Sequence, residues 1–465
     1  MLKMQAKHRA HTAKYSKGLT TIMHTPSSSG GHPLNQTDVL IVGSGCSGLY
    51  TALNLPRHLK ITLITKAGLT ENDSYLAQGG ICMLRDDSDF DAYFADTLRA
   101  GHGENDRSSV TIMIRDSKSI IEDLVGYGVT FARNADGSFC FTREGAHSQN
   151  RILFHEDITG REITSHLLTA VQALPNVTLM PHTTLLDIVE DDGTCAGGIL
   201  LGANGKLSAV AARHTVLACG GIGGLYPHST NFHHLTGDAL AIALHHHVAL
   251  KNIDYVQIHP TTLYTPNPEE RSFLISESVR GEGALLYDKN GRRFVDELLP
   301  RDKLTQAIHA QMRKDQTPFV WEDLRPIPAR ERHAHFPNII AHCAEHGYDV
   351  DRECIPVVPA QHYFMGGVAV NYESATSMPQ LYAVGETACN GVHGRNRLAS
   401  NSLLESLVFA RRAARDISVR TEAAPSLHPF NAIDWDHYAD SRRLEENNHE
   451  QVKLAINRVH ARCIA

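Results

Sequence analysis

The sequence predicts an α/β fold built around a parallel sheet, with a smaller α+β domain inserted into the chain. An apolar run at residues 38–42 is followed directly by Gly43-Ser-Gly-Cys-Ser-Gly48, and a second apolar run follows at 60–65. This order of strand, glycine turn, helix and strand is a βαβ unit, from which parallel sheets are built. The alternation of strands and helices is lost between about 250 and 355 and then returns. The interruption indicates an insertion.

The individual elements follow from local patterns in chain order. We expect a buried strand over 38–42, a helix that includes 49–55 and a strand over 60–65. Farther along, the patterns predict a helix at 159–174, strands at 177–180 and 185–189, a β-meander at 195–217, strands at 368–370 and 381–384, and helices at 400–415 and 432–462. Glycine pairs and Asn-Gly turns mark the corners of the meander.

Four kinds of segment are expected. The first 37 residues contain five Lys or Arg and no Asp or Glu, which is typical of a disordered arm or of an organellar targeting segment. Met23 is an alternative start. The predicted segments are this arm at 1–36, a main domain at 37–250 and 356–430, a capping domain at 251–355, and a truncated C-terminal helical region at 431–465.

Composition excludes several function classes. The 44 Lys and Arg against 51 Asp and Glu give a net charge of -7, which offers no basic field to nucleic acid. No apolar run reaches the roughly 20 residues that cross a bilayer, so we expect no membrane partner and a cytoplasmic location. A plastid or another organelle is the alternative if the first residues are a transit peptide.

No metal site is expected. The nine cysteines are scattered and form no CxxC pair, which fits reduced thiols rather than a disulfide framework or a zinc site. The run His245-His-His247 looks metal-like, but adjacent residues on a helix do not face one another.

The glycine turn has the spacing of a dinucleotide fingerprint. Gly43 would make the tight turn, Gly45 would admit a pyrophosphate, and Gly48 would let the helix pack closely on the strand. The helix N-terminus would then offer free N–H groups to the phosphates. The second strand ends in Thr65-Lys66 rather than in an acidic residue that could bind a ribose. This departure argues against a simple nicotinamide site.

Many ordered segments together resemble one superfamily. They include Ala77-Gln-Gly-Gly80, Thr142-Arg-Glu-Gly-Ala-His-Ser148, His259-Pro-Thr261, Arg280-Gly-Glu-Gly283, Pro300-Arg-Asp302, His362-Tyr363 and His393-Gly-Arg-Asn-Arg397. On these segments, over roughly 37–430, the chain resembles the succinate dehydrogenase and fumarate reductase flavoproteins and, within them, the L-aspartate oxidase family. The resemblance implies a Rossmann-like FAD-binding domain with an inserted cap.

The resemblance also implies how FAD is held. Membrane-complex relatives attach the flavin through a histidine just before the AQGG run, and Asp73 stands at that place here, so the FAD is expected to be non-covalent. Glu386 is expected to accept from the ribitol, and the helix that begins at Ser402 to face the flavin pyrimidine. The implied contacts are Gly43, Ser44, Gly45, Cys46, Ser47, Gly48, Lys66, Asp73, Ser74, Tyr75, Leu76, Ala77, Gln78, Gly79, Gly80, Thr184, Leu185, Asp238, Glu386, Ser402 and Leu403.

The superfamily reaction moves a hydride between a dicarboxylate carbon and flavin N5, so its site must neutralise two carboxylates and handle a proton. Guanidinium groups suit this, because they pair with carboxylates bidentately and stay charged. By resemblance the substrate clamps are His259, Thr261, His362 and Arg397, and Arg301 stands where the family places its proton-transfer arginine. Glu144 matches the position that would pair with the ammonium group of an amino acid.

The implied reaction is oxidation of L-aspartate to iminoaspartate, with oxygen or fumarate as electron acceptor, on the way to quinolinate and NAD. Quinolinate synthase is the expected consumer of the product. Two alternatives stay open: a fumarate reductase or succinate dehydrogenase flavoprotein subunit, and a redox-inactive flavoprotein. The second is considered because the C-terminal helical region is shorter than in related oxidases.

Overall fold

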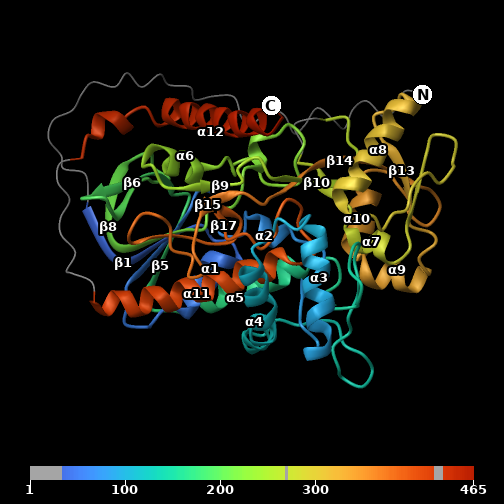
Figure 1. Ribbon diagram of the computed structural model, residues 1–465, viewed down its shortest axis with the longest axis horizontal. Helices are drawn as coiled ribbons and strands as arrows, with labels where there is room; N and C mark the ends of the chain where they lie inside the picture. Colours follow the sequence, from blue (N-terminus) through green and yellow to red (C-terminus); the bar gives the residue numbers. More distant parts are fainter. Residues whose placement is uncertain (1–33, 268–270, 424–432, 465) are drawn as a thin grey trace, which may run out of the picture. The chain divides into compact units, whose positions relative to one another are not determined.

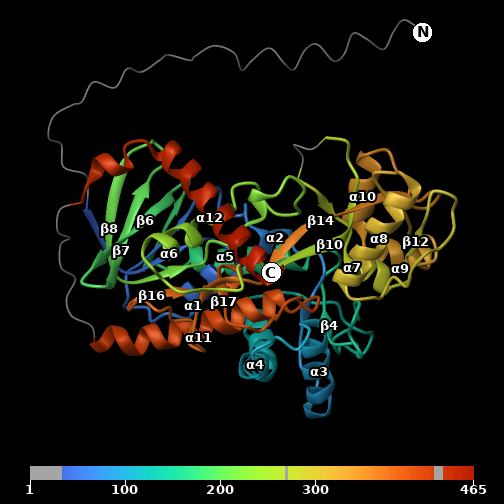
Figure 2. The same ribbon diagram turned by 45° about the horizontal axis from the view of Figure 1, so that its top comes forward.

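The structure is a computed structural model that describes residues 34–267, 271–423 and 433–464. The arm predicted at 1–36 therefore lies outside the described residues, except that 34–36 belong to the first strand. Figures 1 and 2 show a large sheet with helices on both faces and a smaller cap formed by the yellow and orange part of the chain. Both the α/β class and the inserted α+β cap are confirmed.

The main sheet has seven strands around a parallel centre. Its order is β5 (Val177–Pro181), β2 (Ile61–Thr65), β1 (Leu34–Val42), β8 (Leu207–Leu217), β7 (Thr194–Leu201) and β6 (Thr184–Asp191), and β16 (Leu381–Ala383) also pairs with β8. β1 runs parallel to β2 and β8, whereas β6, β7 and β8 form the predicted antiparallel meander. β1 begins four residues before the strand that the sequence predicted at 38–42.

The alternation of side chains along β1 explains why the sheet is covered on both faces. Val39 and Ile41 pack into one hydrophobic cluster with helices α1 (Cys46–Asn54), α5 (Thr159–Gln172) and α11 (Ser402–Ala423). Leu40 and Val42 point the other way, into a second cluster with α6 (Asp238–His245). Successive residues of a strand face opposite sides, so a strand that is apolar throughout is buried on both.

The cap is an antiparallel sheet with its own core. Its strand order is β11 (Phe273–Leu274), β10 (Val256–Leu263), β14 (Ile355–Phe364), β13 (Val320–Asp323) and β12 (Leu285–Tyr287). Helices α7 (Glu277–Gly281), α8 (Arg301–Asp315), α9 (Ala329–His335) and α10 (Pro337–Glu345) complete it. The predicted boundary at 355 falls at the start of β14, so the cap sheet extends to Phe364.

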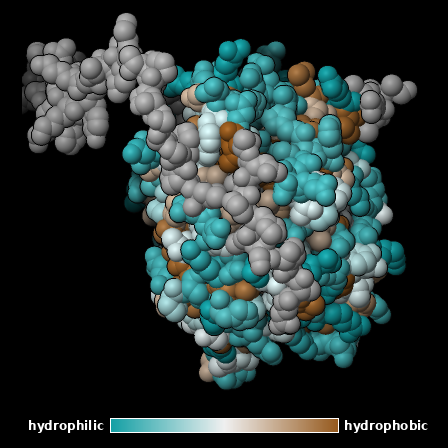
Figure 3. All heavy atoms as spheres, turned by 90° about the vertical axis from the view of Figure 1, so that its left-hand side faces the viewer, coloured by the Kyte–Doolittle hydropathy of each residue, from teal (hydrophilic) through white to brown (hydrophobic). Residues whose placement is uncertain are grey.

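Smaller elements connect these layers. They are α2 (Asp73–Leu76), β3 (Ile81–Cys82), α3 (Phe90–Ala100), α4 (Arg107–Gly126), β4 (Ile152–Leu153), β9 (Leu250–Lys251), β15 (Gly367–Ala369) and β17 (Ala388–Cys389). The C-terminal helix α12 (Ser441–Ile464) lies against α6 (Figure 1), where Val452 is buried beside Leu240. None of the helices in the described ranges is long and apolar enough to cross a membrane. The face in Figure 3 is mostly hydrophilic where it is coloured.

A fully buried ion cluster fixes the segment that carries Glu144. Arg151 donates to Asp89 at 2.9 Å and to Asp96 at 2.7 Å, and all three side chains are shielded from water. Asp96 also accepts from the Ser148 backbone N–H at 2.7 Å. The cluster therefore ties residues 144–151 to helix α3.

We predict that Arg151→Met destabilises the protein by about 3–5 kcal/mol, because it removes the fully buried cation of the cluster and leaves Asp89 and Asp96 with only the partly exposed Arg85 and Arg99. Urea unfolding measures this change. Arg133→Met is the matched control, since Arg133 is exposed on a nearby turn and should change stability by less than about 0.5 kcal/mol. Equal effects of the two substitutions would contradict a structural role for the cluster.

Candidate active site

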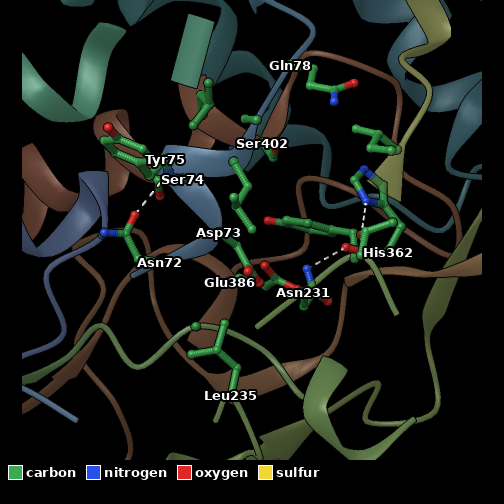
Figure 4. A pocket seen from close by; sticks show the side chains of 18 of the residues that line it. Asn72, Asp73, Ser74, Tyr75, Gln78, Asn231, Leu235, His362, Glu386 and Ser402 are labelled. Carbon is green, nitrogen blue, oxygen red and sulfur yellow. Dashed lines mark hydrogen bonds between the residues drawn. The ribbon is translucent and has the colours of Figure 1, made fainter. Parts of the chain in front are cut away.

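One continuous cavity runs from the glycine turn after β1 to the cap. The main-domain wall comes from the glycine turn, residues 71–80, Glu144 and residues 386–406, and the cap wall comes from β10, α7, α8 and β14. Figure 4 shows side chains from these distant segments pointing into one space. The cavity is thus assembled from both parts of the fold.

The glycine turn has the close approaches that its spacing predicts. Gly43 has φ +121°, and a Cβ on it would lie 2.0 Å from the carbonyl oxygen of Ala218. A Cβ on Gly48 would lie 2.1 Å from the carbonyl oxygen of Gly43, so only glycine lets α1 start this close to β1. Gly45 lines the cavity, and the helix begins directly after it. Its N-terminal N–H groups suit a phosphate.

Residues 72–80 form the neighbouring wall. Asn72 caps the short helix α2 by accepting from the Tyr75 backbone N–H at 3.0 Å (Figure 4). The Asn72 amide also donates to the Ser44 carbonyl at 3.2 Å, which fastens this segment to the glycine turn. A Cβ on Gly80 would lie 2.3 Å from the Leu153 carbonyl oxygen, so the tight packing here requires glycine.

The cavity wall has the polar character that FAD requires. Five side chains that line it have a buried polar atom with no hydrogen-bond partner among the described residues: Ser44, Asp73, Gln78, Asn231 and His259. Buried polar groups are normally satisfied, so these atoms mark where a ligand rich in hydroxyl, phosphate and amide groups would bind. The long cavity, the glycine turn and these atoms together fit the cofactor.

Two half-buried carboxyl groups lie side by side on this wall. Asp73 accepts from the Phe232 backbone N–H at 3.1 Å, and Glu386 accepts from the Phe364 backbone N–H at 2.8 Å. In Figure 4 the two side chains are neighbours. Burial raises the pKa of both groups, and the negative charge of Asp73 raises that of Glu386 further. A neutral carboxyl group can both donate to and accept from a hydroxyl-rich ligand.

Lys66 lines the cavity, but its ammonium group is already occupied. Its Nζ donates to Thr236 at 3.3 Å, to Asp238 at 3.2 Å and to Glu445 of α12 at 2.7 Å. An ammonium has three N–H donors, so all of them are used within the protein. Lys66 therefore joins α12 and α6 to the end of β2 in this structure.

Most of the predicted cofactor residues line the cavity, and a few do not. Those on the wall are Gly43, Ser44, Gly45, Ser47, Lys66, residues 73–80, Asp238, Glu386, Ser402 and Leu403. Cys46 and Gly48 lie behind the wall within α1, where Gly48 serves packing. Thr184 and Leu185, which were also expected to contact FAD, begin β6 and do not line the cavity.

Two buried arginines share one neutral partner at the cap end. The Gln257 side-chain carbonyl accepts from Arg301 Nη1 at 2.9 Å and from Arg397 Nε at 3.2 Å. Arg301 also pairs with Glu277 at 2.5 Å. Arg397 donates to the Ser402 hydroxyl at 2.5 Å and stacks over the Tyr363 ring at 4.3 Å, but it makes no ion pair within the described residues. Burial, and then the charge of Arg301, lower the pKa of Arg397 to about 10.

The predicted histidines lie together beside these arginines. His259 and His362 have ring centroids 5.1 Å apart, and both line the cavity. Burial and the charge of Arg301 hold the pKa of each well below its ordinary value, so both rings are neutral at pH 7. Thr261 does not line the cavity: its hydroxyl donates to the Ile275 carbonyl at 3.1 Å, so the structure does not support a direct substrate contact.

Glu144 also lines the cavity, and it makes no ion pair among the described residues. Its two oxygens accept from the Ser278 hydroxyl at 2.7 Å and the Ser400 hydroxyl at 2.6 Å. The residue is only 4% exposed. Burial and the neighbouring charge of Glu277 raise its pKa.

Sequence reasoning missed several residues of this site. Gln257, Glu277, Ser278 and Ser400 hold the predicted arginines and Glu144 in place. Of these four residues, only Glu277 could have been found from the sequence. It lies one helical turn before Arg280, and Arg280 begins one of the segments on which the family resemblance rests. The run His245–His247 is also accounted for, because His246 pairs with Asp187 and Glu190 and His245 with Gln451.

Comparison with known proteins identifies the family. The FAD binding domain family matches residues 38–403. L-aspartate oxidase of Clostridium acetobutylicum is 46% identical over 383 residues, covering 82% of this chain and 88% of that protein. The chain belongs to the L-aspartate oxidase family. The Nostoc L-aspartate oxidase is 42% identical over 422 residues, covering 87% and 72% of the two chains. The cofactor is FAD.

Solved structures agree with this assignment. An Escherichia coli quinol fumarate reductase superposes with a TM-score of 0.79 at 31% identity, covering 89% of this chain and 74% of that chain. A quinol-fumarate reductase with menaquinol molecules gives a TM-score of 0.80 at 32% identity, with coverages of 89% and 75%. The L-aspartate oxidase family is thus closer in sequence than these reductases.

We predict that the FAD is released when the protein is denatured with acid, because Asp73 offers a carboxyl group where a covalent link would need a histidine. Acid precipitation followed by absorbance of the supernatant measures the released flavin. Flavin fluorescence that stays with the denatured polypeptide on a gel would contradict the prediction.

Proposed function

We propose that the chain oxidises L-aspartate to iminoaspartate, with oxygen or fumarate as the acceptor of the electrons. The product would be consumed by quinolinate synthase on the way to NAD. The proposal rests on the family and on the charges of the cap end of the cavity.

Two unpaired buried charges carry this proposal. The Arg397 guanidinium has only neutral partners, and the Glu144 carboxylate has only hydroxyl partners. A buried charge without a counter-ion is costly, so each favours a ligand of opposite charge. Arg301 adds a second buried cation that Glu277 alone neutralises. A ligand with two carboxylates and one ammonium group complements this set, and L-aspartate is such a molecule.

The residues divide the work of binding and proton transfer. Arg397 would bind one substrate carboxylate bidentately. The neutral His362 would donate a hydrogen bond to the other from Nε2, because its Nδ1 lies 2.7 Å from the Thr230 hydroxyl. The neutral His259 already donates its Nε2–H to the Ile275 carbonyl at 2.9 Å, so it would present an accepting Nδ1 to this end of the cavity. Arg301 would hold a proton next to the reacting carbons, in hydrogen-bond contact with Glu277 behind it. FAD, when bound, accepts the hydride from the substrate. The N-terminus of α11 at Ser402 and Leu403 would stabilise negative charge on the reduced cofactor.

The rival functions differ in what they require. A succinate dehydrogenase or fumarate reductase flavoprotein subunit needs no group for an ammonium, so the unpaired Glu144 favours the amino acid oxidase. A redox-inactive flavoprotein would not require Arg301 or Arg397 to be buried in the cavity. Turnover assays with L-aspartate, succinate and fumarate separate these candidates: the proposal predicts oxidation of L-aspartate and little oxidation of succinate. A preference for succinate would overturn it.

Substitution of the two arginines should have different kinetic effects. Arg397→Leu should mainly raise KM, by about tenfold to over a hundredfold, because a hydrogen bond to a charged group contributes roughly 1.5–3 kcal/mol. Arg301→Leu should mainly lower the rate of the chemical step. Steady-state kinetics with L-aspartate and rapid-mixing measurement of flavin reduction distinguish the two effects. An Arg301→Leu enzyme with a normal rate of flavin reduction would remove Arg301 from the mechanism.

Glu144 should carry the preference for an amino acid over a plain dicarboxylate. Glu144→Gln keeps the shape but removes the charge, and its amide accepts from one serine hydroxyl and donates to the other. The value of kcat/KM for L-aspartate should fall by the factor that corresponds to a loss of roughly 2–4 kcal/mol of transition-state stabilisation. Reduction of fumarate, which has no ammonium group, should stay near normal and serves as the internal control. Equal losses on both substrates would instead make Glu144 a structural residue.

A further inference from the structure

The side-chain amide of Gln257 has all of its hydrogen-bonding positions occupied. Its carbonyl oxygen accepts from the guanidinium groups of Arg301 and Arg397. Its Nε2 donates to Asn396 Oδ1 at 2.9 Å and to the Arg397 backbone carbonyl at 2.8 Å. A side-chain amide has two donor hydrogens and two acceptor lone pairs, so none is left over. Gln257 is 3% exposed, so these four contacts within the protein hold its amide in place.

The chemistry of its partners permits only one orientation of the Gln257 amide. A guanidinium group cannot accept a hydrogen bond, so the carbonyl oxygen must face the two arginines. A backbone carbonyl cannot donate one, so the nitrogen must face the carbonyl of Arg397. The second N–H then points to Asn396 Oδ1. A reversed amide would lose all four contacts.

Asn396 is itself held at the end of helix α3. Its Nδ2 donates to the Ala100 carbonyl at 3.1 Å, and the Arg395 backbone N–H donates to the next carbonyl, that of Gly101, at 3.1 Å. Because a carbonyl only accepts, the first contact turns Oδ1 of Asn396 toward Gln257. Asn396 is 5% exposed. The end of α3 thus fixes the Asn396 amide, and the Asn396 amide helps to fix that of Gln257.

These contacts cross the boundary between the cap and the FAD-binding domain. Gln257 lies in β10 and Arg301 begins α8, both in the cap, whereas Asn396 and Arg397 lie in the loop before α11. The two arginines therefore come from different parts of the fold but donate to the same oxygen atom. The separation of the two guanidinium groups depends on where that oxygen lies. From the side of the FAD-binding domain, Asn396 and the Arg397 carbonyl hold the Gln257 amide in that place.

We propose that Asn396 is a positioning residue that sets the separation of Arg301 and Arg397 through Gln257, and thereby makes the site selective for a four-carbon dicarboxylate over a five-carbon one. The inference rests on the proposed function, in which both arginines face one substrate. Without the Asn396 oxygen, Gln257 has a buried N–H with no partner, which is costly. The amide then tilts toward any new acceptor, and its oxygen moves with it. The two guanidinium groups are no longer held at one separation.

The test measures how tightly the FAD-loaded enzyme binds succinate and glutarate, two dicarboxylates that differ by one methylene group. Binding is followed as a change in the absorbance spectrum of the oxidised flavin. We expect Asn396→Leu, a substitution of similar size, to weaken the binding of succinate by about tenfold and to change that of glutarate little, so that the preference for succinate is largely lost. Asn396→Ser, whose oxygen lies one bond nearer the backbone, should give the same loss of preference.

Asn105→Ala is the matched control for a residue that only supports the loop. Asn105 is 8% exposed and holds the same loop from the side of α3, by donating to the Val392 carbonyl at 2.8 Å. It makes no hydrogen bond to Gln257 within the described residues. Asn105→Ala should lower the melting temperature, as Asn396→Leu does, but leave the ratio of the two dissociation constants at its wild-type value. An equal change of that ratio in both variants would overturn the proposal.

A double-mutant cycle tests whether Asn396 acts through Gln257. Gln257→Leu removes the oxygen that the two arginines share. Adding Asn396→Leu to that variant should therefore change the ratio of the succinate and glutarate dissociation constants by less than about twofold. If the two substitutions change the ratio independently, so that their effects multiply, Gln257 is not the link and the proposal is wrong.

Failure of this inference can be told apart from failure of the proposed function. A wild-type enzyme that binds neither dicarboxylate, or that L-aspartate fails to reduce, would overturn the proposed function. A wild type that L-aspartate reduces, but whose preference for succinate over glutarate is unchanged by Asn396→Leu, would overturn the positioning role alone. A wild type that L-aspartate reduces and that binds both dicarboxylates equally well would do the same.

Discussion

The cap end of the cavity is organised by the burial of two guanidinium groups beside a single neutral amide. Gln257 accepts from both Arg301 and Arg397 with one carbonyl oxygen, so it holds two like charges close together without neutralising either. Like charges in a region shielded from water repel strongly. Glu277 pairs with Arg301 at 2.5 Å, so Arg397 is the guanidinium left without a counter-ion, and an anionic ligand bound to it would relieve the remaining repulsion.

The rest of the structure supports that arrangement from separate segments. Gln257 comes from β10, Arg301 begins α8, and Arg397 lies in the loop that precedes α11. Glu144 faces them from a loop held by the buried Arg151 cluster. Because Arg301 and Gln257 belong to the cap whereas Arg397 and Glu144 belong to the FAD domain, the cap must be seated on the FAD domain for the site to be complete. The glycine turn lines the other end of the same cavity, where it would bind the phosphates of FAD.

The sequence predicted best those features that depend on neighbours along the chain. The glycine turn and the βαβ unit are local, because Gly48 packs against Gly43 in the same turn, although Gly43 itself also approaches Ala218 after β8. The positions of Arg301 and Arg397 were predicted from resemblance, and the cavity contains both. Gln257 was missed because a glutamine has no distinctive signature: its role comes from lying between arginines 44 and 140 positions away.

Other differences have similar causes. The hydroxyl of Thr261 is taken by a backbone carbonyl of the neighbouring strand segment, which no motif reveals. Lys66 lines the cavity, but its ion pair with Glu445 could not be predicted, because α12 returns from the end of the chain to supply that carboxylate. The predicted boundary at 355 falls at the first residue of the cap strand β14, because the sequence pattern shows no break where that strand ends.

Anaerobic titration of the FAD-loaded protein with L-aspartate tests the central claim most directly. If the unpaired charges of Arg397 and Glu144 are there to receive an amino dicarboxylate, L-aspartate should bleach the flavin absorbance completely, and succinate at the same concentration should leave it nearly unchanged. A flavin that stays oxidised with L-aspartate, or that succinate bleaches equally well, would contradict the account.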